Sequence, residues 1–170
     1  MSVSRPAVSV TRLARHDEGV QISARGDYAV RAALSLAAAY PAVLSAQALA
    51  KEQDLPRKFL EAVLADLRRA GIVRAQRGAD GGYTLARSPD QVTIGSILRA
   101  VDGPLAAVRG LRPEQTQYAG AAEQLPKLWI AVRAAVRDVV DEVSLAHVVT
   151  GKMPRHVHRL TERPDAWLPR

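Results

Sequence analysis

The sequence predicts a mostly helical protein with one small β-hairpin, an α+β fold in which helices dominate. Three observations support this fold class. Apolar residues recur at three- and four-residue spacing in several segments of the 170-residue chain, which is typical of amphipathic helices. Residues 72–86 instead look like two short strands around a glycine-rich turn. Two short predicted helices directly precede this hairpin, and helix, turn, helix and hairpin is the order of elements in a winged helix-turn-helix.

The first predicted helix runs from Ala24 to Tyr40. Ser23 can cap its N-terminus, because a serine oxygen accepts a hydrogen bond from the free N–H groups of the first turn. Pro41 ends the helix. The preceding residues, 1–20, are polar and basic without a helical period, so we expect a disordered N-terminal extension.

Between Ser45 and Gly71 the chain predicts two helices joined by a tight turn. Ser45 is a good N-cap for the first helix, and residues 53–55 end it. Pro56 suits the first turn of the second helix, where no N–H is needed. Gly71 supplies the positive φ that a helix C-terminus favours. The second helix is expected to bury one stripe, made of Phe59, Leu60, Val63, Leu64 and Leu67.

The hairpin is followed by a short helix, a loop and a long helix. Thr93 can cap the short helix, which ends at Asp102-Gly103. The apolar residues of segment 105–122 recur at no regular spacing, which predicts a loop with one helical turn. The longest amphipathic helix then begins at Leu125, and Ser144 begins a last short helix. The apolar stripe of the long helix consists of Leu128, Trp129, Val132, Val136, Val139, Val140 and Val143.

This stripe predicts a homodimer. One subunit alone would leave it exposed, whereas pairing two long helices would bury it and set two recognition helices about one DNA turn apart. Trp129 can be read as part of an effector pocket, but an aromatic residue on an apolar stripe is more often core or interface. We therefore assign Trp129 to the dimer interface.

Composition restricts the class of partner. The net charge is +7 and the pI near 10.4, which indicates a polyanionic partner. Residues 23–87 hold ten Lys or Arg against six Asp or Glu, so the winged segment carries much of this excess. The absence of cysteine excludes disulfides, thiolate nucleophiles and cysteine-ligated metal sites. No apolar run approaches a membrane span and no signal peptide is visible, so we expect a soluble, cytoplasmic protein without a membrane partner.

Double-stranded DNA is the partner that fits this pattern. In a winged helix-turn-helix, the N-terminal residues of the second helix meet base edges in the major groove. Here these are Pro56, Arg57, Lys58 and Glu61. Arg57 or Lys58 can donate to guanine O6 and N7, and Glu61 can accept from cytosine N4. The alternative is that these are ordinary solvated charges on an amphipathic helix.

Other candidate DNA contacts lie around this helix. Arg77 is predicted to probe the minor groove, since Gly78 and the glycines after it let the backbone approach phosphates. A tight hairpin with an incidental arginine is the alternative. Ser45 and Gln47 at the start of the first motif helix, and Arg25 near the start of the chain's first helix, are predicted to contact backbone phosphates.

Several motifs carry a resemblance to a known family: Ser23–Ala32, Phe59–Glu61, Leu67–Val73, Arg77–Tyr83 and Ile94–Gly103. They are similar to the opening signature, recognition helix, wing and following segment of the Rrf2 group of bacterial transcriptional regulators, over about residues 21–150. The resemblance implies a homodimer, a dimerisation helix at Pro126–Val143 and a palindromic operator. It also places Arg57, Lys58 and Glu61 on the base-reading turn.

The chain departs from this group in one respect. Cluster-binding members place three cysteines in the loop before the long helix, here residues 105–125, and this chain has none. The resemblance therefore does not extend to an iron–sulfur site, and no metal or cofactor is predicted. Whether a small molecule or a partner protein acts through this loop, or no effector exists, stays open.

The resulting domain organisation has four parts. They are a disordered N-terminal extension at 1–20, a winged helix-turn-helix DNA-binding domain at 21–103, an effector-type loop with the dimerisation helix at 104–150, and a flexible basic tail at 151–170. We expect a homodimeric repressor of transcription. A winged-helix protein-interaction module and a non-specific DNA-binding protein are the alternatives. Catalysis is not indicated, because the chain shows no phosphate loop, nucleophile elbow or paired catalytic carboxylates.

Overall fold

The computed structural model of the chain describes residues 22–78 and 80–168. The predicted disordered extension lies outside the described residues. Short 3-10 turns occupy Pro89–Gln91, Pro113–Gln115, Gly120–Ala122 and Pro164–Trp167. The helices are α1 (Ala24–Ala39), α2 (Ala46–Gln53), α3 (Arg57–Arg69), α4 (Ile94–Asp102), α5 (Leu125–Val140), α6 (Leu145–Thr150) and α7 (Arg155–Thr161), and the strands are β1 (Val73–Gln76) and β2 (Gly82–Leu85).

Helix α1 is the centre of a helical body, in which it packs against α2, α3, α4, α6 and β2. Its inward face is made largely of alanine, and Ala29, Ala32 and Ala33 are fully buried. Such small side chains let the neighbouring helices approach closely and fill the space with their own leucines. The predicted N-cap is confirmed, since the Ser23 hydroxyl accepts a 2.8 Å hydrogen bond from the Gly26 N–H.

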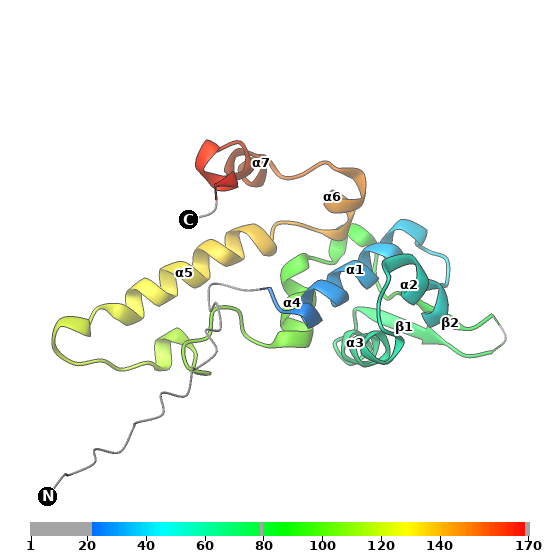
Figure 1. Ribbon diagram of the computed structural model, residues 1–170, viewed down its shortest axis with the longest axis horizontal. Coiled ribbons are helices and arrows are strands. Elements are labelled where there is room, and N and C mark those ends of the chain that lie inside the picture. Colours follow the sequence, from blue (N-terminus) through cyan, green and yellow to red (C-terminus); the bar gives the residue numbers. More distant parts are fainter. Residues whose placement is uncertain (1–21, 79, 169–170) are drawn as a thin grey trace, which may run out of the picture.

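The hairpin forms as the sequence predicts. Strands β1 and β2 pair antiparallel, with Val73 opposite Leu85 and Gln76 opposite Gly82. The hairpin projects from the body at the end of the molecule opposite α5 (Figure 1). Together with α2 and α3 it completes a winged helix-turn-helix, so the predicted fold class is confirmed.

Helix α5 extends away from this body (Figure 1), and none of its sixteen residues is buried. It ends at Val140, three residues before the predicted Val143. The assignment of Val143 to the exposed stripe is wrong. That residue lies beyond the helix, is only 6% exposed, and its carbonyl accepts a hydrogen bond from Ile94 N–H in its own subunit.

The C-terminal segment contains regular structure that the sequence did not predict. Helix α7 lies beside α5, where His156 Nε2 is 2.8 Å from the Asp138 carbonyl oxygen. A 3-10 turn follows it at Pro164–Trp167. Across the described residues, no helix combines the length and the apolar character that crossing a membrane requires.

Candidate nucleic-acid interface

The first turn of α3 carries the predicted base-reading residues at the surface. Pro56 is the N-cap, and Arg57, Lys58 and Glu61 are all exposed. Arg57 Nε lies 2.9 Å from Glu61 Oε1, one helical turn away. An exposed pair of this kind contributes only about 0.2–1 kcal/mol, so a base or phosphate can replace either partner at low cost.

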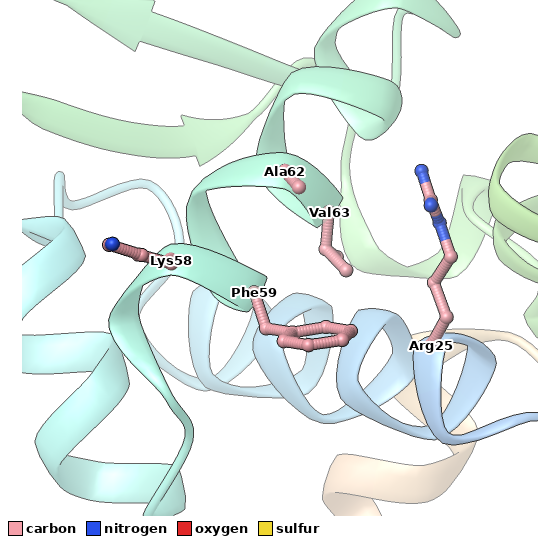
Figure 2. Close-up of a pocket in the computed structure, with 5 residues that line it drawn as sticks. All are labelled: Arg25, Lys58, Phe59, Ala62 and Val63. Atoms are coloured by element: carbon pink, nitrogen blue, oxygen red, sulfur yellow. The ribbon is translucent and has the colours of Figure 1, made fainter.

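The prediction that Phe59 belongs to the buried stripe is wrong. Its side chain is 55% exposed, whereas the other four stripe residues are fully buried. The ring meets Tyr28 of α1 edge to face, with the centroids 6.1 Å apart. Figure 2 shows it on the flank of α3, in an open hollow of about 350 Å³ between α1 and α3. The hollow is lined by Arg25, Lys58, Phe59, Ala62 and Val63.

The residue before the N-cap of α2 is fixed to strand β2 of the hairpin. Leu44 and Tyr83 exchange two backbone hydrogen bonds of 2.9 and 2.8 Å. This contact requires glycine at position 82, because a Cβ there would lie 2.3 Å from the Leu44 carbonyl oxygen. Ser45 and Gln47 are both exposed in the first turn of α2, next to this junction. The two predicted phosphate contacts are therefore held in a fixed position relative to the wing.

The tip of the wing is open to solvent. Arg77 and Gly78 are both exposed, and Gly78 has a φ of +117°, which a residue with a side chain rarely adopts. Gly81 closes the turn, and a Cβ on it would lie 2.7 Å from the Gln76 carbonyl oxygen. Gly78 and Gly81 thus carry no side chain that would keep their backbone away from DNA.

Arg25 has a partner that the sequence did not reveal. Its guanidinium forms an ion pair with Asp66 of α3, whose other carboxylate oxygen lies 2.8 Å from Arg69 Nη1. Asp66 is 7% exposed, and its pKa is lowered, first of all by the hydrogen bond from Arg25. The Arg25 side chain stays 44% exposed. The pair ties the start of α1 to the recognition helix.

A second polar cluster, also missed by the sequence reasoning, holds the turn between α2 and α3. The Arg31 guanidinium donates to the Gln53 carbonyl oxygen, and the Gln53 side chain donates to the buried Ser35 hydroxyl at 2.7 Å. Asp54, which follows, adopts a left-handed φ of 50°. These contacts join residues far apart in the chain, so no local pattern could indicate them. Together they set the angle at which α3 leaves α2.

Comparison with known proteins identifies this arrangement. A family model for Rrf2, described as an iron-dependent transcriptional regulator, matches residues 22–151. The chain belongs to the Rrf2 family. A candidate HTH-type transcriptional regulator of Mycobacterium tuberculosis H37Rv, Rv1287, is 41% identical over 144 residues, which cover 84% of this chain and 89% of that protein. The HTH-type transcriptional regulator CymR of Bacillus subtilis is 34% identical over 127 residues, which cover 74% of this chain and 87% of CymR.

Solved structures of this family agree with the fold. The structure of CymR, the global cysteine regulator of B. subtilis, superposes with a TM-score of 0.67 at 32% identity, over 79% of this chain and 99% of that one. IscR of T. potens superposes with a TM-score of 0.63 at 28% identity, and the match covers 83% of this chain and 97% of IscR. This Rrf2 protein is therefore a DNA-binding transcriptional regulator with a winged helix-turn-helix.

The family description names iron, but the donors of this chain do not fit a cysteine-ligated cluster. The chain has no cysteine, and residues 104–124, the loop before α5, contain no histidine. Glu114 in that loop is already paired with Arg133 of α5 at 2.6 Å. Within the part of the chain that the structure describes, no three His, Cys, Asp or Glu side chains gather as a metal site would need.

Proposed function

We propose that this Rrf2 protein acts in the cytoplasm as a homodimeric repressor that binds a palindromic operator without an iron–sulfur cluster. The observation that supports the dimer most directly is α5. A sixteen-residue helix with a strong apolar stripe and no buried residue is incompletely packed in one subunit. Burial against a second copy would complete it.

In this proposal the apolar stripe of α5 is covered partly by its own subunit and partly by the partner subunit. Val132, Val136, Val139 and Val140 are half-buried, and Leu128 is 51% exposed. Trp129 turns toward its own subunit, where its indole N–H donates to the Tyr118 hydroxyl at 3.3 Å. The loop before α5 thus covers one edge of the helix, α7 of the same subunit lies beside its C-terminal half, and the partner subunit covers the stripe that these leave exposed. Val143 has no part in the interface.

Sequence-specific contacts come from the first turn of α3. Arg57, Lys58 and Glu61 read base edges in the major groove, with the N-terminus of the helix directed at the DNA. Arg77 and Gly78 of the wing approach the minor groove. Ser45, Gln47 and Arg25 contact backbone phosphates on either side. Two such units related by a two-fold axis would recognise two inverted half-sites.

Repression is the simplest outcome for such a dimer. In the described residues, the chain beyond the winged body consists of α5, the loop before it, α7 and a 3-10 turn. A dimer of this size on a promoter acts by excluding other proteins from the same DNA. We assign no catalytic role to any residue.

Selection of bound sequences from a random DNA pool by the purified protein tests this proposal. We expect an enriched palindrome, bound by a dimer in sedimentation, with an affinity that falls steeply as salt rises because phosphate contacts release counterions. Binding without an enriched motif would refute sequence-specific recognition. An affinity for DNA that does not depend on salt would favour the protein-interaction module instead.

A further inference from the structure

Four arginines converge where the DNA-binding body, the loop before α5 and α5 itself meet. Arg99 comes from α4, Arg112 from the loop, and Arg133 and Arg137 from successive turns of α5. They line an open hollow of about 270 Å³ together with Pro104 and Glu114. We name this hollow the arginine pocket.

Two of these arginines are held in place by carboxylates of the same subunit. Arg133, whose side chain is only 15% exposed, lies 2.6 Å from Glu114 Oε2. Arg99 lies 2.8 Å from Asp141 Oδ1. The hydrogen bond from its own backbone N–H and the one from Arg133 lower the pKa of Glu114, so this partner stays ionised.

The other two arginines have no such partner. Among the described residues, no carboxylate lies within ion-pair distance of Arg112 or Arg137, and both are exposed. Four arginines therefore face two carboxylates, Glu114 and Asp141, which leaves an excess of two positive charges, and the charge of Arg112 also helps to lower the pKa of Glu114. Guanidinium groups from three different segments, half of them already fixed, present converging N–H donors of the kind that bind phosphate or carboxylate oxygens.

We propose that the arginine pocket binds a small anion with at least two negative charges, carried by phosphate or carboxylate groups, and that this anion regulates the DNA-binding body. The regulatory half of this inference rests on the proposed function. The pocket is lined by residues of α4, the loop and α5, and by none of α3 or the wing, so such a ligand would not compete directly for the DNA surface. By joining α4, the loop and α5, it would fix the angle at which α5 leaves the body.

The first experiment measures binding without DNA. Pyrophosphate and citrate are each titrated into the full-length protein by calorimetry at constant ionic strength. We expect at least one to bind with a Kd of about 1 mM or tighter. The double variant Arg112→Gln/Arg137→Gln should weaken this binding by roughly tenfold or more, since two charge-assisted contacts are lost. Preference for pyrophosphate or for citrate would distinguish a phosphate ligand from a carboxylate ligand.

The control removes the same charge from another basic surface. Arg155→Gln/Arg159→Gln lies on α7 and should bind the probe as the unmodified protein does. Circular dichroism of both double variants verifies their fold. Absence of binding by the unmodified protein, or an equal loss in the control, would overturn the inference. So would a change of oligomeric state in Arg112→Gln/Arg137→Gln without probe binding, because the pocket would then belong to the subunit interface.

A second experiment separates the site from its regulatory role. The bound probe should change operator affinity of the unmodified protein but not of Arg112→Gln/Arg137→Gln, at matched ionic strength. Probe binding without any effect on operator affinity would overturn the regulatory role and leave the anion site standing. Absence of operator binding in all samples would count against the proposed function. It would leave the anion site standing, because the calorimetry measures anion binding without DNA.

Discussion

Replacing Asp66 with asparagine should destabilise the protein, because it breaks the link between α1 and α3. The carboxylate is 7% exposed and pairs with Arg25 and Arg69, whose side chains are 44% and 76% exposed. Exposed ion pairs contribute about 0.2–1 kcal/mol each, and hydrogen bonds to charged groups about 1.5–3 kcal/mol. Asp66 is buried but its partners reach solvent, so we expect the free energy of unfolding to fall by about 1–2 kcal/mol.

The pH dependence gives this prediction a second test. The folded-state pKa of Asp66 is lowered below the ordinary value of 3.8, chiefly by the Arg25 hydrogen bond. A lowered pKa means that the stabilisation is fully present above the unfolded-state value and is lost as the pH falls through the folded-state value. The stability difference between the unmodified protein and Asp66→Asn should therefore be constant from pH 7 down to about 4 and shrink below it.

Urea denaturation followed by circular dichroism measures both effects. We expect a lower midpoint for Asp66→Asn at pH 7 with an unchanged slope, and a difference between the two proteins that narrows as the pH falls below about 4. Glu61→Gln is a suitable control, since it removes an exposed pair of the same helix and should cost well under about 1 kcal/mol. Equal stability of Asp66→Asn and the unmodified protein at pH 7, or a stability difference that grows as the pH falls below about 4, would refute the role of the ion pair.

Four further substitutions test the wing, the recognition helix and α5. Gly82→Ala should destabilise the fold by about 1–3 kcal/mol, because its Cβ would overlap the Leu44 carbonyl oxygen; unchanged urea denaturation would contradict this. Lys58→Ala and Arg77→Ala should each weaken operator binding by about 1–3 kcal/mol if they make good base contacts, and gel shifts identical to the unmodified protein would remove that assignment. Val136→Asp should give monomers by placing a charge in an apolar seam, whereas an intact dimer in sedimentation would exclude the α5 interface.

Local signals in the sequence predicted most of the elements correctly. A cap needs only a residue of the right type at the right position, and Ser45, Thr93 and Ser144 each accept the expected hydrogen bond from a backbone N–H three residues on. Gly71 likewise adopts the expected positive φ of 69°. These features depend on a few consecutive residues, so the printed sequence contains all the information they need.

The errors and omissions arise where the outcome depends on a neighbour distant in the chain. Helical periodicity assigns Phe59 to the buried face, but the elements around α3 leave this flank open. The same period continues to Val143 although the helix ends earlier and the chain turns back into the body. Asp66 pairs with an arginine 41 positions away, which no local pattern reveals. The DNA contacts themselves stay predictions, supported by the exposure of the residues concerned.

A continuous series of contacts joins the end of α5 to the DNA-binding body. Ile94 N–H donates to the Val143 carbonyl oxygen at 2.8 Å, which ties the chain after α5 to the start of α4. Gly95 lets Asp141 approach so closely that a Cβ at this position would lie 1.9 Å from the carboxylate oxygen. Helix α4 packs on α1, and α1 is joined to α3 by the ion pair of Arg25 with the buried Asp66. These contacts connect α5 to α3 through α4 and α1, so a ligand or partner that changed the angle at which α5 leaves the body would act on α3 along this series of contacts.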